Sequence, residues 1–103
     1  MDQVFRALGD ETRRRILALV WDEERSAGDV AQCFRMSRPG VSQHLKVLLE
    51  AGVVTVRPRG THRFYRANQD ALRRVQAALA AYWDDRLRRL KLAAEAAVRE
   101  RSP

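Results

Sequence analysis

The sequence predicts a mainly α-helical domain with one small β-hairpin. Apolar residues recur at intervals of three and four along most of the chain, which is the spacing of helices that bury one face. The pattern changes between residues 53 and 66, where β-branched and aromatic residues flank a glycine turn, as in a hairpin. The chain has 103 residues, a length that suits one domain over residues 1–103.

The composition favours a polyanionic partner. The chain is 46% hydrophobic and carries a net charge of +7, so it has material for a core and a strongly basic surface. All but two of its 20 basic residues are arginine, a bias that a GC-rich genome also produces, so charge alone does not identify nucleic acid. With one cysteine, no signal peptide and no apolar run of membrane length, we expect a cytoplasmic protein without a membrane partner.

The N-terminal segment predicts two helices. The first covers residues 2–8, and the second is capped by Asp10 or Thr12 and ends between residues 21 and 24. Its first turns carry three consecutive arginines at residues 13–15, where positive charge opposes the helix dipole. Three interpretations stay open for this triplet: a solvated face, phosphate contacts, or an ion pair.

A pair of short helices follows, joined by a tight turn. Ser26 is a good cap for the first, and Ser37 for the second, which covers most of residues 37–52. In this second helix the apolar residues that share one face are Val41, Leu45 and Leu48. Two helices in this arrangement form a helix-turn-helix, here over about residues 26–51.

The opposite face of the second helix is small, polar and basic. Pro39, Gln43 and Lys46 lie there, flanked by Gly40 and Ser42. Proline is tolerated in the first turn because its missing N–H would have no intrahelical partner. Such a helix fits a DNA major groove, where glutamine and lysine can bind base edges or phosphates.

The predicted hairpin forms a wing over about residues 53–67. Its strands are residues 53–57 and 62–66, and Gly60 supplies the turn between them. Pro58 belongs at the hairpin mouth or on an edge, because it has no N–H for a central ladder. A two-stranded hairpin is not stable alone and must pack on the helices.

A last helix, capped by Asn68, covers about residues 69–100. At 1.5 Å per residue it is roughly 48 Å long. Its apolar stripe outruns the small domain and predicts a second copy as its partner; the alternative is a helix that packs on its own domain and frays. The stripe comprises Leu72, Val75, Leu79, Trp83, Leu87, Leu90, Ala94 and Val98.

Three segments, residues 4–17, 36–48 and 51–54, resemble the ArsR-type winged helix-turn-helix transcriptional repressors. The resemblance implies a homodimer whose interface is formed by the first and last helices. This dimer would bind a pseudo-palindromic operator near a promoter, often the promoter of its own gene, and so block transcription. The dimer contacts expected here are Val4, Phe5, Leu79, Tyr82, Trp83, Leu87 and Leu90.

The metal-sensing ligands of that family are missing from this sequence. Where arsenic sensors carry a Cys-x-Cys pair, this chain has Ser26 and Gly28, and its last helix has carboxylates but no histidine. We therefore expect no metal and no cofactor. We also expect Cys33 to be a small buried hydrophobe rather than a redox sensor.

Double-stranded DNA is the predicted partner. Gln43 and Ser42 are the expected base readers, and Lys46 and Arg38 the expected phosphate contacts. His44 either packs against the core or reaches a phosphate. The charged residues of the wing are all arginine. Charges of either sign would keep an exposed strand edge from pairing with another strand, so purely positive charge favours phosphate or minor-groove contact instead. The full expected set is Ser37, Arg38, Pro39, Gly40, Ser42, Gln43, His44, Lys46, Arg57, Arg59 and Arg63.

No catalytic motif occurs in the sequence, so an enzyme is not expected. The primary interpretation is a homodimeric, metal-independent repressor. One alternative is a repressor of the same family that responds to a metal, a thiol oxidant or a small molecule. A second is a winged helix used only for protein association.

Overall fold

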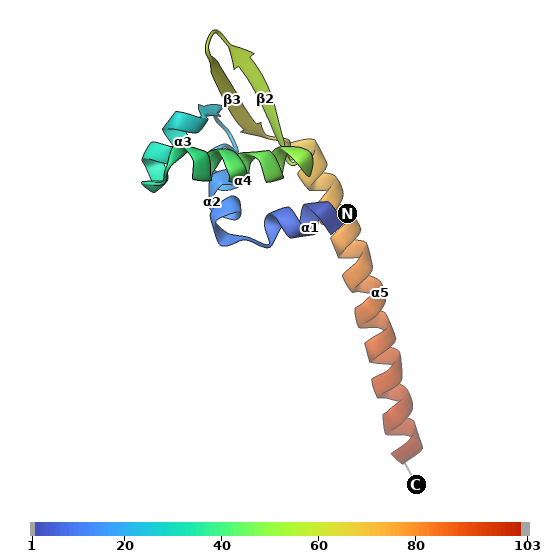
Figure 1. Ribbon diagram of the computed structural model, residues 1–103. Coiled ribbons are helices and arrows are strands. Elements are labelled where there is room, and N and C mark those ends of the chain that lie inside the picture. The colour runs from blue at the N-terminus through green and yellow to red at the C-terminus, as the bar shows by residue number, and fades with distance from the viewer. Residues whose placement is uncertain (1, 102–103) are drawn as a thin grey trace. The chain divides into compact units, whose positions relative to one another are not determined.

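Five helices and a three-stranded sheet make up the computed structural model, which describes residues 2–101 (Figure 1). The mainly helical fold with a small hairpin is thereby confirmed. In chain order the elements are α1 (Asp2–Leu8), α2 (Glu11–Leu19), β1 (Arg25–Ser26), α3 (Ala27–Phe34), α4 (Arg38–Glu50), β2 (Val54–Arg59), β3 (His62–Ala67) and α5 (Gln69–Arg101).

These elements fall into two compact units, one up to Leu72 and one from Arg73 onwards. The first unit contains the predicted helix-turn-helix and wing, and the second is the remainder of α5. The boundary between the two units therefore lies within α5, the long last helix. None of the helices in the described part of the chain is long and apolar enough to cross a membrane.

Short polar side chains begin four of the helices, as the sequence predicts. Each cap oxygen accepts a hydrogen bond from the backbone amide three residues later, at 2.9–3.2 Å, which satisfies one of the amides that a helix start leaves free. The pairs are Asp10 with Arg13, Ser26 with Asp29, Ser37 with Gly40, and Asn68 with Ala71. The register of the helices is therefore set locally.

Helix α4 lies at the centre of the first unit. It packs against α1, α2, α3 and β2, and its residues Val41, Leu45 and Leu48 are completely buried. The largest side chains that join them in the core are Ile16, Val20, Val30 and Val53. The predicted apolar face of α4 is thus the face that holds it in place.

The wing is a hairpin with one strand added that the sequence did not predict. The strand order is β1-β3-β2, with both pairs antiparallel, and the hairpin projects away from the helices (Figure 1). Gly60 takes a φ of 61° in the turn, and Pro58 lies in β2, an edge strand. β1 has only two residues, too few to show alternation, so only its pairing with β3 reveals it.

The arginine triplet follows none of the three expected interpretations as a group. Arg13 donates from Nε to the Ala7 carbonyl at 2.7 Å and from Nη2 to the Arg6 carbonyl at 2.9 Å. Arg14 donates to the Leu8 carbonyl at 2.8 Å. These two side chains therefore pair with carbonyls at the end of α1: those of Ala7 and Leu8, and that of Arg6, which also accepts from the Gly9 amide at 3.3 Å. Arg15 instead lies over the ring of Phe34.

Two further predictions about the helices were wrong. Helix α2 ends at Leu19 rather than between residues 21 and 24, because the backbone leaves the helical conformation at Val20. Cys33 is exposed, not buried. On α3 the buried residues are Val30 and Ala31, with Phe34 partly buried beside them, and Cys33 lies outside this arc.

Helix α5 contains 33 residues, which corresponds to about 50 Å, and none of them is buried. Its large exposed apolar side chains include the predicted dimer contacts Leu79, Tyr82, Trp83, Leu87 and Leu90. Tyr82 and Trp83 stack edge to face with ring centroids 5.6 Å apart. In the first unit, the predicted contact Phe5 is also exposed, whereas Val4 packs partly against the core.

Candidate nucleic-acid interface

The outer face of α4 carries the predicted DNA-contacting residues. Arg38, Ser42, Gln43 and Lys46 are all exposed on this helix. Ser37 and Pro39 are exposed at its start, and Gly40 is partly buried. Since the opposite face is completely buried, the core fixes which side chains this helix presents outward.

The start of α4 favours a glycine at position 40. A Cβ added to Gly40 would lie 3.1 Å from the hydroxyl oxygen of Ser37, which caps the helix. The first turn contains Pro39 and no acidic side chain. The N-terminal end of the helix therefore combines small residues, a partial positive charge and a basic side chain, which suits an anionic partner.

His44 lies beside the cap of α2. Its side chain is partly buried, and its Nδ1 lies 3.9 Å from Oδ2 of Asp10, the cap of α2. The backbone amide of Arg13, which donates to the same carboxylate, lowers the pKa of Asp10 most, and the nearby His44 lowers it further. His44 thus contacts the cap of α2 from α4; its packing against the core and its contact with a phosphate both stay predictions.

Arg57 is the wing residue that the structure places differently from Arg59 and Arg63. Glu24 accepts two hydrogen bonds from its guanidinium, from Nε at 3.0 Å and from Nη2 at 2.7 Å. This pairing lowers the pKa of Glu24 and raises that of Arg57. Arg57 must release Glu24, or share its guanidinium, to bind a phosphate.

Glu24, the partner of Arg57, is not among the residues that the sequence predicts for this surface. Glu24 lies 33 positions before Arg57, so no pattern within the hairpin indicates the pair. It reaches the wing because it directly precedes β1, which pairs with β3. Only the prediction of β1 would have indicated it.

The two arginines near the tip of the wing form no ion pair in the described part of the chain. Arg59 and Arg63 are exposed, and within residues 2–101 no carboxylate forms an ion pair with either of them. With Arg38 and Lys46 they form a basic surface on α4 and the wing, all within the first unit. Such a surface matches the charge of a nucleic-acid backbone.

The positions that correspond to the metal-binding cysteines have other tasks here. Ser26 uses its hydroxyl oxygen to cap α3, and Gly28 has no side chain. Across the described residues there is no group of three or more histidine, cysteine or acidic side chains that would hold a metal ion. The donor set at residues 26 and 28 does not fit a soft metal.

Comparison with known proteins agrees with this geometry. Residues 8–57 match a family model described as a helix-turn-helix domain. The chain is 39% identical over 72 residues to the transcriptional repressor SdpR of Bacillus subtilis (strain 168), a match that covers 70% of this chain and 80% of SdpR.

Two solved structures have the same fold. One, a possible transcriptional regulator for arsenical resistance, is 39% identical, with a TM-score of 0.72 over 87% of this chain and 93% of the other. The second is the solution structure of the winged helix-turn-helix DNA-binding domain of Mb0332 from Mycobacterium bovis, described as homodimeric and as a possible ArsR-family regulator. It is 29% identical, with a TM-score of 0.66 over 84% of this chain and 80% of the other. The chain belongs to the ArsR family of winged helix-turn-helix transcriptional regulators.

Proposed function

We propose that this regulator is a homodimeric repressor that inserts α4 into the major groove of a pseudo-palindromic operator. The observation that carries the proposal is the contrast between the two faces of α4. One face is locked into the core by Val41, Leu45 and Leu48, and the other presents Gln43 and Lys46 to solvent. A rigid helix with an exposed polar face is what base readout requires.

Within this arrangement Gln43 and Ser42 read bases. A glutamine side chain donates and accepts together, so it can pair with adenine through two hydrogen bonds, worth about 1–3 kcal/mol of discrimination. Arg38, Lys46, Arg59 and Arg63 contact phosphates and supply affinity without sequence preference.

The second copy covers the apolar stripe of α5. Tyr82 and Trp83 are both more than half exposed, and aromatic residues of this size are typical anchors of protein interfaces. Two copies related by a two-fold axis would place their α4 helices in half-sites about one helical turn apart. The homodimeric description of the Mb0332 domain and the repressor name of SdpR support this reading.

The repressor acts without a bound metal in this proposal. The support is chemical: Ser26 and Gly28 lack thiolates, and carboxylates alone make a poor transition-metal site. Titration of metal ions and of thiol oxidants into the protein–DNA complex tests this point. Release of DNA by a metal would contradict it, and release by an oxidant would assign a sensing role to the exposed Cys33.

The deciding experiment selects DNA from a random-sequence duplex library with the wild-type protein and compares two variants on the selected site across a salt series. Gln43→Ala is expected to relax base preference at one position per half-site, by about 1–3 kcal/mol. Arg59→Ala is expected to weaken all sequences alike and to reduce the log–log salt slope by ~0.9 per phosphate lost.

Either of two outcomes contradicts the proposal. If the wild-type protein enriches no sequence, the winged helix serves protein association instead. If both variants bind selected and random DNA as the wild type does, the outer face of α4 and the wing are not the DNA-binding surface.

A further inference from the structure

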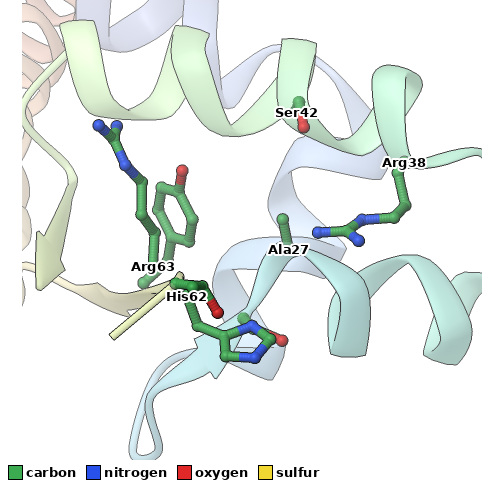
Figure 2. A pocket seen from close by; sticks show the side chains of 8 residues that line it. Ala27, Arg38, Ser42, His62 and Arg63 are labelled. Atoms are coloured by element: carbon green, nitrogen blue, oxygen red, sulfur yellow. The ribbon is translucent and has the colours of Figure 1, made fainter. Parts of the chain in front are cut away.

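A pocket of about 250 Å³ lies between the start of α3, the first turns of α4 and the tip of the wing. Figure 2 shows Arg38 and Arg63 on opposite sides of it, with Ser42 on the α4 side and His62 on the wing side. All these elements belong to the first compact unit. The pocket is lined by Ser26, Ala27, Arg38, Ser42, Thr61, His62, Arg63 and Tyr65.

The lining is rich in hydrogen-bond donors and contains no carboxylate. Two guanidinium groups and four hydroxyl groups face one small volume, and no acidic residue is among the residues that line it. Arg38 and Arg63 also have no ion-pair partner among residues 2–101. Two cations that share a cavity without a counter-charge favour the binding of an anion.

The guanidinium of Arg38 lies close to Gly28 of α3. A Cβ added to Gly28 would lie 3.7 Å from the guanidinium carbon of Arg38, so this side chain lies over the first turn of α3. Ser26 begins the same turn; its oxygen accepts from the Asp29 amide at 3.1 Å, which leaves its hydroxyl proton free to donate. Donors from α3, α4 and the wing therefore meet at one place.

We propose that this pocket binds one phosphate group of the DNA backbone, held by Arg38 from α4 and Arg63 from the wing together. The inference rests on the proposed DNA-binding function and adds a specific contact to it. Arg38 and Arg63 are not independent phosphate contacts but two sides of one clamp, with Ser26 as a further donor. The clamp couples the position of the wing to that of α4 on the duplex.

DNA duplexes in which single phosphates are replaced by uncharged groups test the proposal. Each phosphate of the selected duplex is replaced in turn by an uncharged methylphosphonate, and wild-type affinity is measured for each. Since Lys46 and Arg59 contact other phosphates in the proposed complex, several positions are expected to weaken binding. At the position held by Arg38 and Arg63, one per half-site, the loss is expected to be about tenfold or more, as for loss of charged hydrogen bonds. In the Arg38→Ala/Arg63→Ala double variant the same replacement is expected to have no effect.

A double-mutant cycle gives an independent readout. If both arginines bind one phosphate, the double variant loses less affinity than the product of the two single losses, and its salt slope falls by ~0.9 per half-site. Two separate phosphates would give multiplied losses and a fall of about 1.8 per half-site. That result would overturn the clamp.

Arg66→Ala is the matched control. Arg66 lies on β3 like Arg63, is exposed, and is offset by three residues, which places it on the other face of the strand and outside the pocket. This variant loses the same charge and is expected to keep the methylphosphonate dependence of the wild type. Thermal unfolding of each variant checks that the fold is unchanged.

The outcome separates the clamp from the proposed function. If Arg38→Ala and Arg63→Ala bind with wild-type affinity and slope while Gln43→Ala still relaxes base preference, the pocket holds no phosphate and the repressor proposal stands. If the wild-type protein selects no sequence, the repressor proposal fails and the clamp fails with it.

Discussion

Helices α4 and α5 both carry apolar side chains at helical spacing, but only those of α4 are buried. Leu45 of α4 has no exposed surface, whereas Leu87 of α5 is 57% exposed. α4 is surrounded by α1, α2, α3 and β2, and its free face is polar. In α5 no residue is buried, and its apolar stripe is exposed together with its charged residues.

This difference indicates two kinds of partner. A helix whose apolar face is satisfied within its own unit has only polar groups left to offer, which suits DNA. A helix whose apolar stripe is unsatisfied gains free energy when another apolar surface covers it, at about 25 cal/mol per Å² removed from water. The contrast is therefore the physical basis of the proposed dimeric repressor.

The largest expected effect comes from charge placed in the α5 stripe. Leu87→Glu would bury a carboxylate between two copies, and we expect it to give a monomer. Loss of the second half-site contact then lowers affinity for a two-fold operator by about 10²–10⁴-fold, the usual gain from linking two binding events. Sedimentation and DNA titration measure the two effects.

Leu92→Glu is the control for this change. Leu92 is 56% exposed, almost the same as Leu87, but lies on the other side of the helix from the stripe. It is expected to stay dimeric and to bind DNA normally. A dimer that survives Leu87→Glu but not Leu92→Glu would contradict the predicted interface.

The next largest effect is expected from a truncation in the buried face of α4. Leu45→Ala leaves a cavity at a completely buried position, and the free energy of unfolding is expected to fall by about 2–5 kcal/mol. The same truncation at Leu92 is expected to change it by less than about 0.5 kcal/mol. Urea unfolding followed by circular dichroism measures both, and equal losses would show that the contrast between the helices is absent in solution.

A smaller effect concerns the link between α1 and α2. Arg13→Ala removes two donors from the carbonyls of Ala7 and Arg6, and it is expected to cost about 2 kcal/mol, as for hydrogen bonds to charged groups. Arg15→Ala removes the same charge without these bonds and serves as control. Equal unfolding midpoints for the two variants would argue against the capping role of Arg13.

The smallest effect concerns Glu24 and depends on pH. Because Arg57 lowers the pKa of Glu24 in the folded state, their pairing stabilises the fold above the ordinary carboxyl pKa and is lost as the pH falls through the lowered value. The stability difference between wild type and Glu24→Gln is therefore expected at neutral pH and to vanish in acid. Unfolding midpoints at a series of pH values measure it.

Glu24→Gln also frees Arg57 for DNA. If Arg57 then gains a phosphate, the log–log salt slope steepens by ~0.9 per half-site. An unchanged slope would mean that Arg57 does not face the backbone in the complex. Glu23→Gln, an exposed neighbour whose carboxylate lies near Arg25 instead, is the matched control.

The local features of this protein can be predicted from short stretches of sequence. The caps at Asp10, Ser26, Ser37 and Asn68 and the positive φ at Gly60 depend on residues a few positions apart, and the structure has all of them. The apolar face of α4 follows from helical spacing alone. These are the features for which side-chain chemistry and backbone geometry act within a single turn or hairpin.

The features that depend on distant residues follow from tertiary packing and cannot be predicted from local sequence. Arg13 and Arg14 look like surplus charge until α1 places its free carbonyls beside them, and Glu24 reaches Arg57 only because β1 joins the sheet. Cys33 lies just outside the buried arc of α3, and helical spacing alone did not predict whether it would be buried or exposed. The pocket between Arg38 and Arg63 exists for the same reason: packing brings α3, α4 and the wing together, and local sequence does not encode where separate elements meet.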